Sequence, residues 1–227
     1  MKKIFTFALC GLLVFSSCSS MSNLGKGSLI GTGAGAALGA GIGALIGGEK
    51  GAAIGAAAGA AVGAGTGAVI GDVMDRKAEE LEKLENAKVE TITDVNGLTA
   101  IKVTFDSGIL FATNSSTLSA ESKETLAKFA EGIKDLENTN ITVWGHTDNT
   151  GTAAVNEKVS QKRADAVSKQ LQSNGISKDR IFAEGKSFNM PVADNETEEG
   201  RALNRRVELY ISANADMIKA AEEGTLK

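Results

Sequence analysis

Residues 141–175 read ITVWGHTDNTGTAAVNEKVSQKRADAVSKQLQSNG, and this stretch decides the fold of the carboxyl-terminal half of the chain. Residues 141–144 are all β-branched or aromatic and predict a strand. The polar residues 145–151 predict a turn. Residues 152–174 predict a long helix that ends at Gly175, because glycine is the usual residue just after a helix C-terminus. A strand that turns into a long helix is one half of a strand–helix–strand unit.

Other strands and one more helix surround this unit. Strands are predicted at residues 89–95, 98–105, 108–111, 180–183 and 206–212. The first two are joined by Asn96-Gly97, a strong signal for a hairpin. Ser119 is a typical N-cap, and the helix after it has apolar residues on one face, namely Leu126, Phe129, Ala130, Ile133 and Leu136. This order predicts an α+β fold, with a mixed βαβαββ-type sheet and helices on one face.

Glycine recurs at every fourth position from residue 27 to residue 71. Residues four apart lie on one face of a helix, so these glycines form a groove that a second helix can approach closely. Residues 27–48 and 51–71 carry no charge, and each run is roughly 30 Å long as a helix. We therefore expect a glycine-zipper helical hairpin over residues 27–71, packed on itself or on copies of the chain as a homo-oligomer. A flexible linker would not keep one register of glycines, but the weak lipophilicity of Gly and Ala leaves open whether the hairpin spans a bilayer.

The first residues have the pattern of a secretory signal. A positive start is followed by an apolar run over residues 4–15, which is too short for a spanning helix. Two small residues then precede Cys18, which resembles a lipobox, although Phe15 stands where that pattern usually has Leu. We expect a signal peptide over residues 1–17 and lipid on Cys18. The alternative is an ordinary signal peptide with an incidental cysteine.

Charge appears abruptly after the glycine tract. A lipidated tether is expected over residues 18–26, before the glycines. Residues 72–88 read DVMDRKAEELEKLENAK, and their apolar residues at helical spacing predict a solvated stalk helix. The α+β domain is expected over residues 89–213. Residues 214–227 are expected to form a frayed helix or a tail.

Asp148 and Arg163 are the charged residues with the clearest chemical suggestion. Arg163 interrupts a helical row of apolar residues formed by Val155, Val159, Val167 and Leu171. A guanidinium among apolar neighbours requires an anionic partner. Opposite charges at one pocket suit a zwitterion: Asp148 would take the ammonium group, and Arg163 would hold the carboxylate with a bidentate fork. Backbone N–H groups around Gly151 would add donors. The residues alone favour a simpler alternative, a structural ion pair between Asp148 and Arg163.

Four separated motifs together resemble the OmpA-like peptidoglycan-binding domain. They read LFATN, GHTDNTG, SQKRADAV and GRALNRRVE, at residues 110–114, 145–151, 160–167 and 200–208. With the lipobox, the glycine tract and the charged helix, the whole chain is similar to the YiaD-type glycine-zipper lipoproteins of the OmpA family. Ala112 departs from this pattern, because the family often has Asp after the Phe of its first strand.

This resemblance implies a ligand and a place in the cell. The ligand would be the diaminopimelate head of the peptidoglycan stem peptide, bound by Asp148 and Arg163. Secondary contacts are implied for Asn114, Thr147, Asn156 and Arg205. Ser19 after the lipid-bearing cysteine fits sorting to the outer membrane. The domain would then lie in the periplasm and tether the outer membrane to the cell wall.

Several other functions are not expected. His146 is the only histidine and no free thiol remains after processing, so we expect no metal site and no catalytic nucleophile. No dinucleotide motif or other cofactor signal occurs. The net charge of −4 gives no basic surface for nucleic acid.

Two rival functions remain. One is a stator-like unit of an ion-driven motor, which would need an ionisable residue within a spanning helix, and neither apolar run has one. The other is a zipper-driven oligomer or pore that uses the wall-binding domain only as an anchor.

Overall fold

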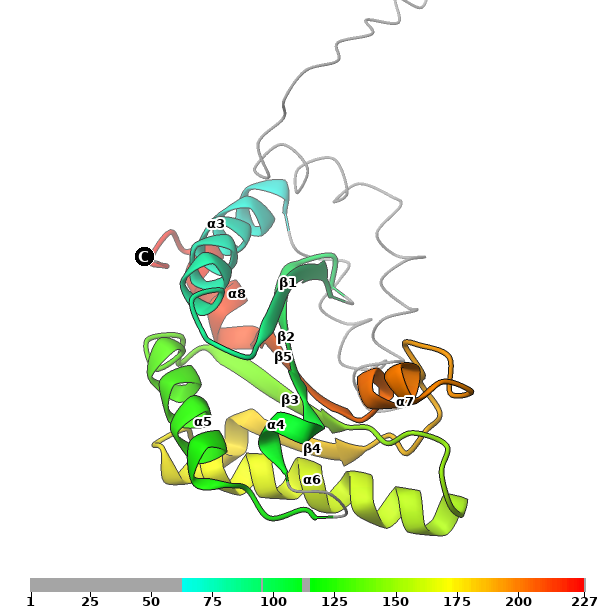
Figure 1. Cartoon of the computed structure of the whole chain (residues 1–227). Coiled ribbons are helices and arrows are strands. Elements are labelled where there is room, and N and C mark those ends of the chain that lie inside the picture. Colours follow the sequence, from blue (N-terminus) through cyan, green and yellow to red (C-terminus); the bar gives the residue numbers. More distant parts are fainter. Residues whose placement is uncertain (1–62, 95, 112–114, 227) are drawn as a thin grey trace, which may run out of the picture.

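The structure is a computed structural model, and it describes residues 63–94, 96–111 and 115–226 (Figure 1). The expected signal peptide, the lipidated Cys18, the tether and residues 27–62 of the glycine tract lie outside the described residues. The zipper hairpin and its oligomer or pore alternative therefore stay predictions. Asn114 also lies outside the described residues.

Five strands form one mixed sheet. They are β1 (Lys88–Thr93), β2 (Thr99–Asp106), β3 (Thr139–Gly145), β4 (Ile181–Gly185) and β5 (Arg206–Ala213). Their order across the sheet is β1-β2-β5-β3-β4. β3 and β4 are parallel, and the other neighbouring pairs are antiparallel. The predicted mixed sheet is confirmed.

The longer helices cover one face of this sheet, whereas the short α7 borders the opposite face (Figure 1). The helices are α3 (Ala64–Leu81), α4 (Ser107–Leu110), α5 (Ala120–Gly132), α6 (Ala153–Ser173), η1 (Lys178–Arg180), α7 (Glu198–Asn204) and α8 (Ala215–Glu222). Alternate residues of β2 and β5 point into the core beneath α3, α5 and α6, and the rings of Phe105 and Phe129 meet edge to face at 6.2 Å. The opposite face of the same strands is polar, with Lys102 and Glu208 among its side chains. This period of two confirms the predicted fold class.

The β1–β2 hairpin is confirmed, but its connection is longer than two residues. The last paired residues are Thr93 and Thr99. Between them, the buried carboxylate of Asp94 accepts the backbone N–H groups of Asn96 and Leu98 at 2.8 and 2.9 Å. Gly97 has a positive φ of 73°, which glycine adopts without strain. The Asp94 side chain satisfies the turn and so ends both strands early.

The strand predicted at residues 108–111 is wrong. These residues belong mostly to α4, and only Phe111 forms an isolated bridge, with Leu118. The Ser122 hydroxyl contacts the carbonyls of Ile109 and Leu110 at 2.9 and 2.8 Å. Because a side chain of α5 satisfies these carbonyls, the segment does not pair with a neighbouring strand.

The predicted solvated stalk over residues 72–88 is also wrong. α3 includes residues 64–71 of the glycine tract, ends at Leu81, and packs against β2, α5 and α8. Ile70, Met74 and Leu81 are fully buried in the domain core. The helical spacing of the apolar residues was therefore a correct signal, but their face covers the chain's own sheet. None of the described helices combines the length and the apolar character needed to cross a membrane.

The chain end is an ordered helix rather than a frayed one. The Asn214 side chain caps α8 by accepting the N–H of Met217 at 3.0 Å, and Met217 and Ala221 are buried. α8 packs on α3, so the two ends of the described chain support each other (Figure 1).

Candidate ligand-binding site

The turn after β3 positions Asp148. The N–H groups of His146 and Thr147 donate to the carbonyls of Arg206 and Ser187 at 2.9 and 3.0 Å, which fixes the start of the turn. The Asp148 Oδ1 atom then accepts the N–H of Thr150 at 2.9 Å. These bonds leave the Asp148 carboxylate at the amino end of α6, mostly buried and oriented by the backbone.

Two further features close the turn onto α6. Asn156 donates from Nδ2 to the Thr150 carbonyl at 2.9 Å. Gly151 has a φ of 89°, and Thr152 caps the helix as its N-cap residue. The predicted turn and helix are thus confirmed, with the helix spanning Ala153–Ser173.

Arg205 is the ion-pair partner of Asp148. Arg205 Nη1 lies 2.7 Å from Asp148 Oδ2, and Arg205 Nη2 lies 3.0 Å from Glu198 Oε1. Burial raises the pKa of Asp148, but the bonds from Arg205 and Thr150 outweigh it and the pKa falls below its ordinary value. The bond to Asp148 in turn raises the pKa of Arg205. Asp148 is therefore an ionised carboxylate at neutral pH.

Arg163 has no carboxylate partner among the described residues. Its side chain is buried, with the residue 6% exposed, and its guanidinium lies 5.3 Å from the centre of the Phe111 ring. Nε donates to the Ser115 carbonyl at 3.2 Å, and Nη1 lies 3.5 Å from the Ser107 hydroxyl. Across the part of the chain that the structure describes, no carboxylate oxygen comes within 4.0 Å of this guanidinium. The expected alternative, an ion pair between Asp148 and Arg163, is thus not formed.

The electrostatics of Arg163 agree with this geometry. Burial lowers its pKa, the neighbouring charge of Arg205 lowers it further, and the charge of Asp148 partly opposes both. The predicted apolar row around Arg163 is buried only toward the end of α6. Val167 and Leu171 are fully buried, but Val155 is 55% exposed, because the first turn of α6 extends past the core.

Arg163 and Asp148 both have hydrogen-bonding positions that their contacts in the structure do not use. A guanidinium carries five N–H donors, of which Arg163 uses two on neutral acceptors, and a carboxylate has about four acceptor positions, of which Asp148 uses two. Ser107 connects the two halves, since its N–H donates to the Arg205 carbonyl at 2.8 Å while its hydroxyl contacts Arg163. A buried cation and a neighbouring anion with free capacity suit a ligand that carries both charges.

The other described residues that were predicted for the site lie around the same turn. Thr147 lies beside Asp148, and its buried hydroxyl has no partner among the described residues. Asn156 fixes the turn, and Arg205 forms the ion pair. The structure therefore brings Thr147, Asp148, Asn156 and Arg205 together around one turn.

Sequence reasoning missed four residues of this site. Ser107, Phe111 and Ser115 surround Arg163, but Phe111 was expected only as part of a strand, and no local signal marks the two serines. Glu198 supports Arg205 from α7, a helix that was not predicted. A signal for it existed: Thr197 followed by two acidic residues is a typical helix start, and its hydroxyl accepts the Gly200 N–H at 3.0 Å.

No metal centre is evident in the described ranges. Outside the gaps at 1–62, 95 and 112–114, no three His, Cys, Asp or Glu residues gather to hold a metal ion. His146 is buried, and burial lowers its pKa. Its Nε2 lies 3.3 Å from Glu208 Oε2 without hydrogen-bond alignment, so we treat this contact as electrostatic.

Comparison with known proteins agrees with this fold. The chain is 40% identical to the probable lipoprotein YiaD of Escherichia coli over 110 residues, which covers 48% of each chain. It is 34% identical to the peptidoglycan-binding protein ArfA of Mycobacterium bovis over 113 residues, covering 50% of this chain and 35% of that protein. The curated relatives that it matches are spanned over 31% to 64% of their length.

A solved structure and two families also match. The cell wall anchor of the T6SS from Pseudomonas aeruginosa is 32% identical, with a TM-score of 0.53, over 62% of this chain and 97% of that one. The YMGG-like Gly-zipper family matches residues 1–77. The OmpA family matches residues 110–205, which include β3, β4 and every described residue of the candidate site except Ser107. The chain therefore carries an OmpA family domain at residues 110–205.

Proposed function

We propose that this chain is a cell-envelope lipoprotein that binds peptidoglycan non-covalently and ties the outer membrane to the cell wall, without catalysis. The ligand is the diaminopimelate head of the stem peptide. Asp148 takes its ammonium group, and Arg163 takes its carboxylate. Thr147, Asn156, Arg205 and Asn114 are secondary contacts. Cys18 carries the lipid that holds the protein in the membrane.

The observation that carries this proposal is the state of Arg163. Its guanidinium is buried, meets only neutral acceptors among the described residues, and has donors to spare. A buried cation without a counter-charge is costly, and a ligand carboxylate would remove that cost. The bidentate geometry of a guanidinium matches a carboxylate.

Arg205 can leave Asp148 when the ammonium group of the ligand binds there. Arg205 contacts Asp148 and Glu198 at the same time. When a ligand ammonium approaches Asp148, Arg205 keeps Glu198 as a partner and is not left unpaired. The partial exposure of Arg205 allows this exchange at the surface.

The relatives support the choice of ligand and location. A peptidoglycan-binding protein, a cell wall anchor and a probable lipoprotein share this domain. The choice of diaminopimelate comes from the family resemblance, and the pair of opposite charges at the site fits such a zwitterion.

Competition with small molecules tests the proposal. The full chain is sedimented with purified sacculi that contain diaminopimelate, in the presence of free diaminopimelate, pimelate or 1,5-diaminopentane. Pimelate lacks both ammonium groups, and diaminopentane lacks both carboxylates. We expect only diaminopimelate to release the protein. Equal release by either control, or no binding to sacculi, would reject a zwitterion site.

A pair of variants removes the same charge at two places. Asp148→Asn is expected to weaken wall binding by more than about tenfold, because the ammonium loses its charged partner. Asp179→Asn changes an exposed residue in η1, at the opposite end of the sheet, and is expected to bind as the unmodified chain does. Equal binding by both variants would remove Asp148 from the site.

A further inference from the structure

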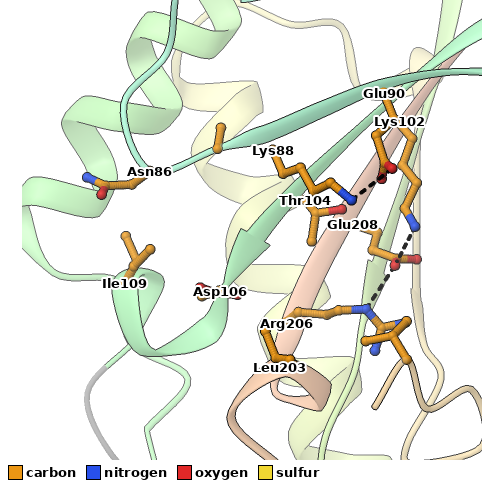
Figure 2. Close-up of a pocket in the computed structure, with 12 residues that line it drawn as sticks. Asn86, Lys88, Glu90, Lys102, Thr104, Asp106, Ile109, Leu203, Arg206 and Glu208 are labelled. Carbon is orange, nitrogen blue, oxygen red and sulfur yellow. Dashed lines mark hydrogen bonds and ion pairs between the residues drawn. The ribbon is translucent and has the colours of Figure 1, made fainter. Parts of the chain in front are cut away.

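A cavity lies on the face of the sheet that the longer helices leave open, with the short α4 and α7 at its rim (Figure 2). Its volume is about 590 Å³, within the usual range for small-ligand pockets. β2 contributes Lys102, Thr104 and Asp106, which alternate with the core residues of that strand and so share the outer face. Arg206 and Glu208 of β5 lie next to them. The proposed wall-binding contacts of Asp148 and Arg163 do not line this cavity.

The floor of the cavity is held rigidly by Glu208. This carboxylate is 2% exposed, and it lies 2.9 Å from Lys102 Nζ and 2.8 Å from Arg206 Nε. Tyr210 donates its hydroxyl to the other carboxylate oxygen at 2.6 Å. Two cations therefore share this one anion. The Lys88–Glu90 ion pair beside them is balanced, and Asp106 lies directly across from Arg206 in the β2–β5 register.

Lys102, Thr104 and Asp106 form a polar stripe on the outer face of β2, and the residues at its two ends have unused hydrogen-bonding groups. Lys102 gives one of its three ammonium donors to Glu208, and its side chain is 21% exposed. Asp106 is exposed, and no cation of the described residues lies within 4.0 Å of its carboxylate. The two residues are four apart along the strand, so their Cα atoms are separated by about 13 Å. Thr104 places a hydroxyl between them (Figure 2).

Apolar side chains form part of the rim. Val192 and Leu203 are 58% and 52% exposed, which is unusual for large aliphatic residues in this domain. They come from the loop before α7 and from α7 itself, and Ile109 of α4 adds a third apolar contact. An aliphatic side chain of a ligand would cover them.

We propose that this cavity binds a short peptide of two or three residues with both termini free. The carboxylate terminus contacts the free ammonium donors of Lys102, and the ammonium terminus contacts the carboxylate of Asp106. A tripeptide spans up to about 10 Å when extended, and the two side chains close the remaining distance. An aliphatic side chain of the peptide packs on Val192 and Leu203.

Calorimetric titration of the full chain with the tripeptide Ala-Leu-Ala tests this site. We expect a dissociation constant below about 1 mM. The same tripeptide with an acetylated amino end and an amidated carboxyl end is expected to bind at least about tenfold more weakly, because it lacks both charges. Absence of binding overturns the proposal. Equal binding of the capped peptide also overturns it, since it would point to an internal segment of a partner protein.

Variants locate the binding and separate it from the wall site. Asp106→Asn is expected to lose affinity for Ala-Leu-Ala about tenfold, and Asp216→Asn, an exposed residue of α8, is the matched control with no loss. Asp148→Asn is expected to keep tripeptide binding, whatever it does to sacculus binding. Loss of tripeptide binding in Asp148→Asn but not in Asp106→Asn would move the peptide to the wall site and reject the cavity.

Discussion

At the residue scale, the proposed grip on the wall depends on the shape of one side chain. Arg163→Ala is expected to weaken sacculus binding by more than about tenfold, since the ligand carboxylate loses a charge-assisted partner worth about 2–5 kcal/mol. Arg163→Lys is expected to restore little of this binding, because an ammonium cannot form the bidentate fork. Co-sedimentation with sacculi, together with the melting temperature of each variant, measures both effects.

Arg180 provides the control for this experiment. Its guanidinium also donates to backbone carbonyls, those of Thr139 and Leu136, but at the opposite end of β3. Arg180→Ala is expected to lower the melting temperature while wall binding is retained at a permissive temperature. If Arg163→Ala behaves in the same way, Arg163 is structural and the site assignment fails.

Glu208 links stability to pH. Burial raises its pKa, but His146, Tyr210, Arg206 and Lys102 together lower it well below the ordinary 4.5. A carboxylate with a depressed pKa in the folded state stabilises the fold above pH 4.5, and this contribution is lost as the pH falls further. Glu208→Gln is expected to cost about 3 kcal/mol at neutral pH, because two cations lose their anion. Its stability should also change less below pH 4.5.

Urea unfolding at a series of pH values measures this effect. Tyr210→Phe serves as the comparison, because it removes one hydrogen bond to Glu208 and leaves both ion pairs. The loss is expected to be about 1.5–3 kcal/mol, with the pH dependence retained. An unchanged pH profile in Glu208→Gln would show that this carboxylate does not govern acid stability.

At the element scale, α3 is part of the folded domain. Met74→Ala is expected to destabilise the chain by about 2–5 kcal/mol, because it leaves a cavity between α3 and the sheet. Val69→Ala on the same helix is the control, since Val69 is 40% exposed and should cost little. A chain that begins at residue 89, the expected domain boundary, should melt well below one that begins at residue 63. Equal melting temperatures would show that α3 adds no stability.

Two glycines differ in whether a larger side chain would fit at their position. A Cβ atom at Gly145 would collide with the Ser160 carbonyl oxygen, where α6 crosses the end of β3. Gly145→Ala is therefore expected to shift α6 and to lower both the melting temperature and wall binding, because Asp148 lies in the turn between β3 and α6 and Arg163 lies on α6. Gly108→Ala meets nothing within 4 Å and should change neither. Retained binding in Gly145→Ala would show that the site tolerates this displacement.

At the scale of the whole molecule, the proposed lipid on Cys18 would decide where the domain acts. Cys18→Ser is expected to abolish incorporation of labelled palmitate and to leave unprocessed or soluble protein. The folded domain should still bind sacculi, because residue 18 lies far along the chain from Asp148 and Arg163. Label that persists in Cys18→Ser would reject the lipoprotein assignment.

Local signals in the amino-acid sequence were sufficient to predict several elements. The β-branched and aromatic run at residues 141–144, the polar residues 145–151 and the glycine at 175 specify a strand, a turn and a helix, and the structure has all three. They also place Asp148 at the helix start and Arg163 within the helix. The four separated motifs were together sufficient to indicate the family. Each strand, turn and helix signal depends on residues a few positions apart, so the local order of amino acids contains the whole signal.

Contacts between residues that are far apart in the chain became known from the folded structure alone. Arg205 pairs with Asp148 over 57 residues, and Ser115 accepts from Arg163 over 48. α3 contains residues that were predicted to form a solvated stalk, but it packs against β2 and α8. The short helix α4 forms where a strand was predicted, because a side chain of α5 donates to its carbonyl groups. An apolar stripe or a charge specifies that a partner is needed. It does not specify which partner, because the free energy of burial and ion pairing depends on the surroundings that the folded chain supplies.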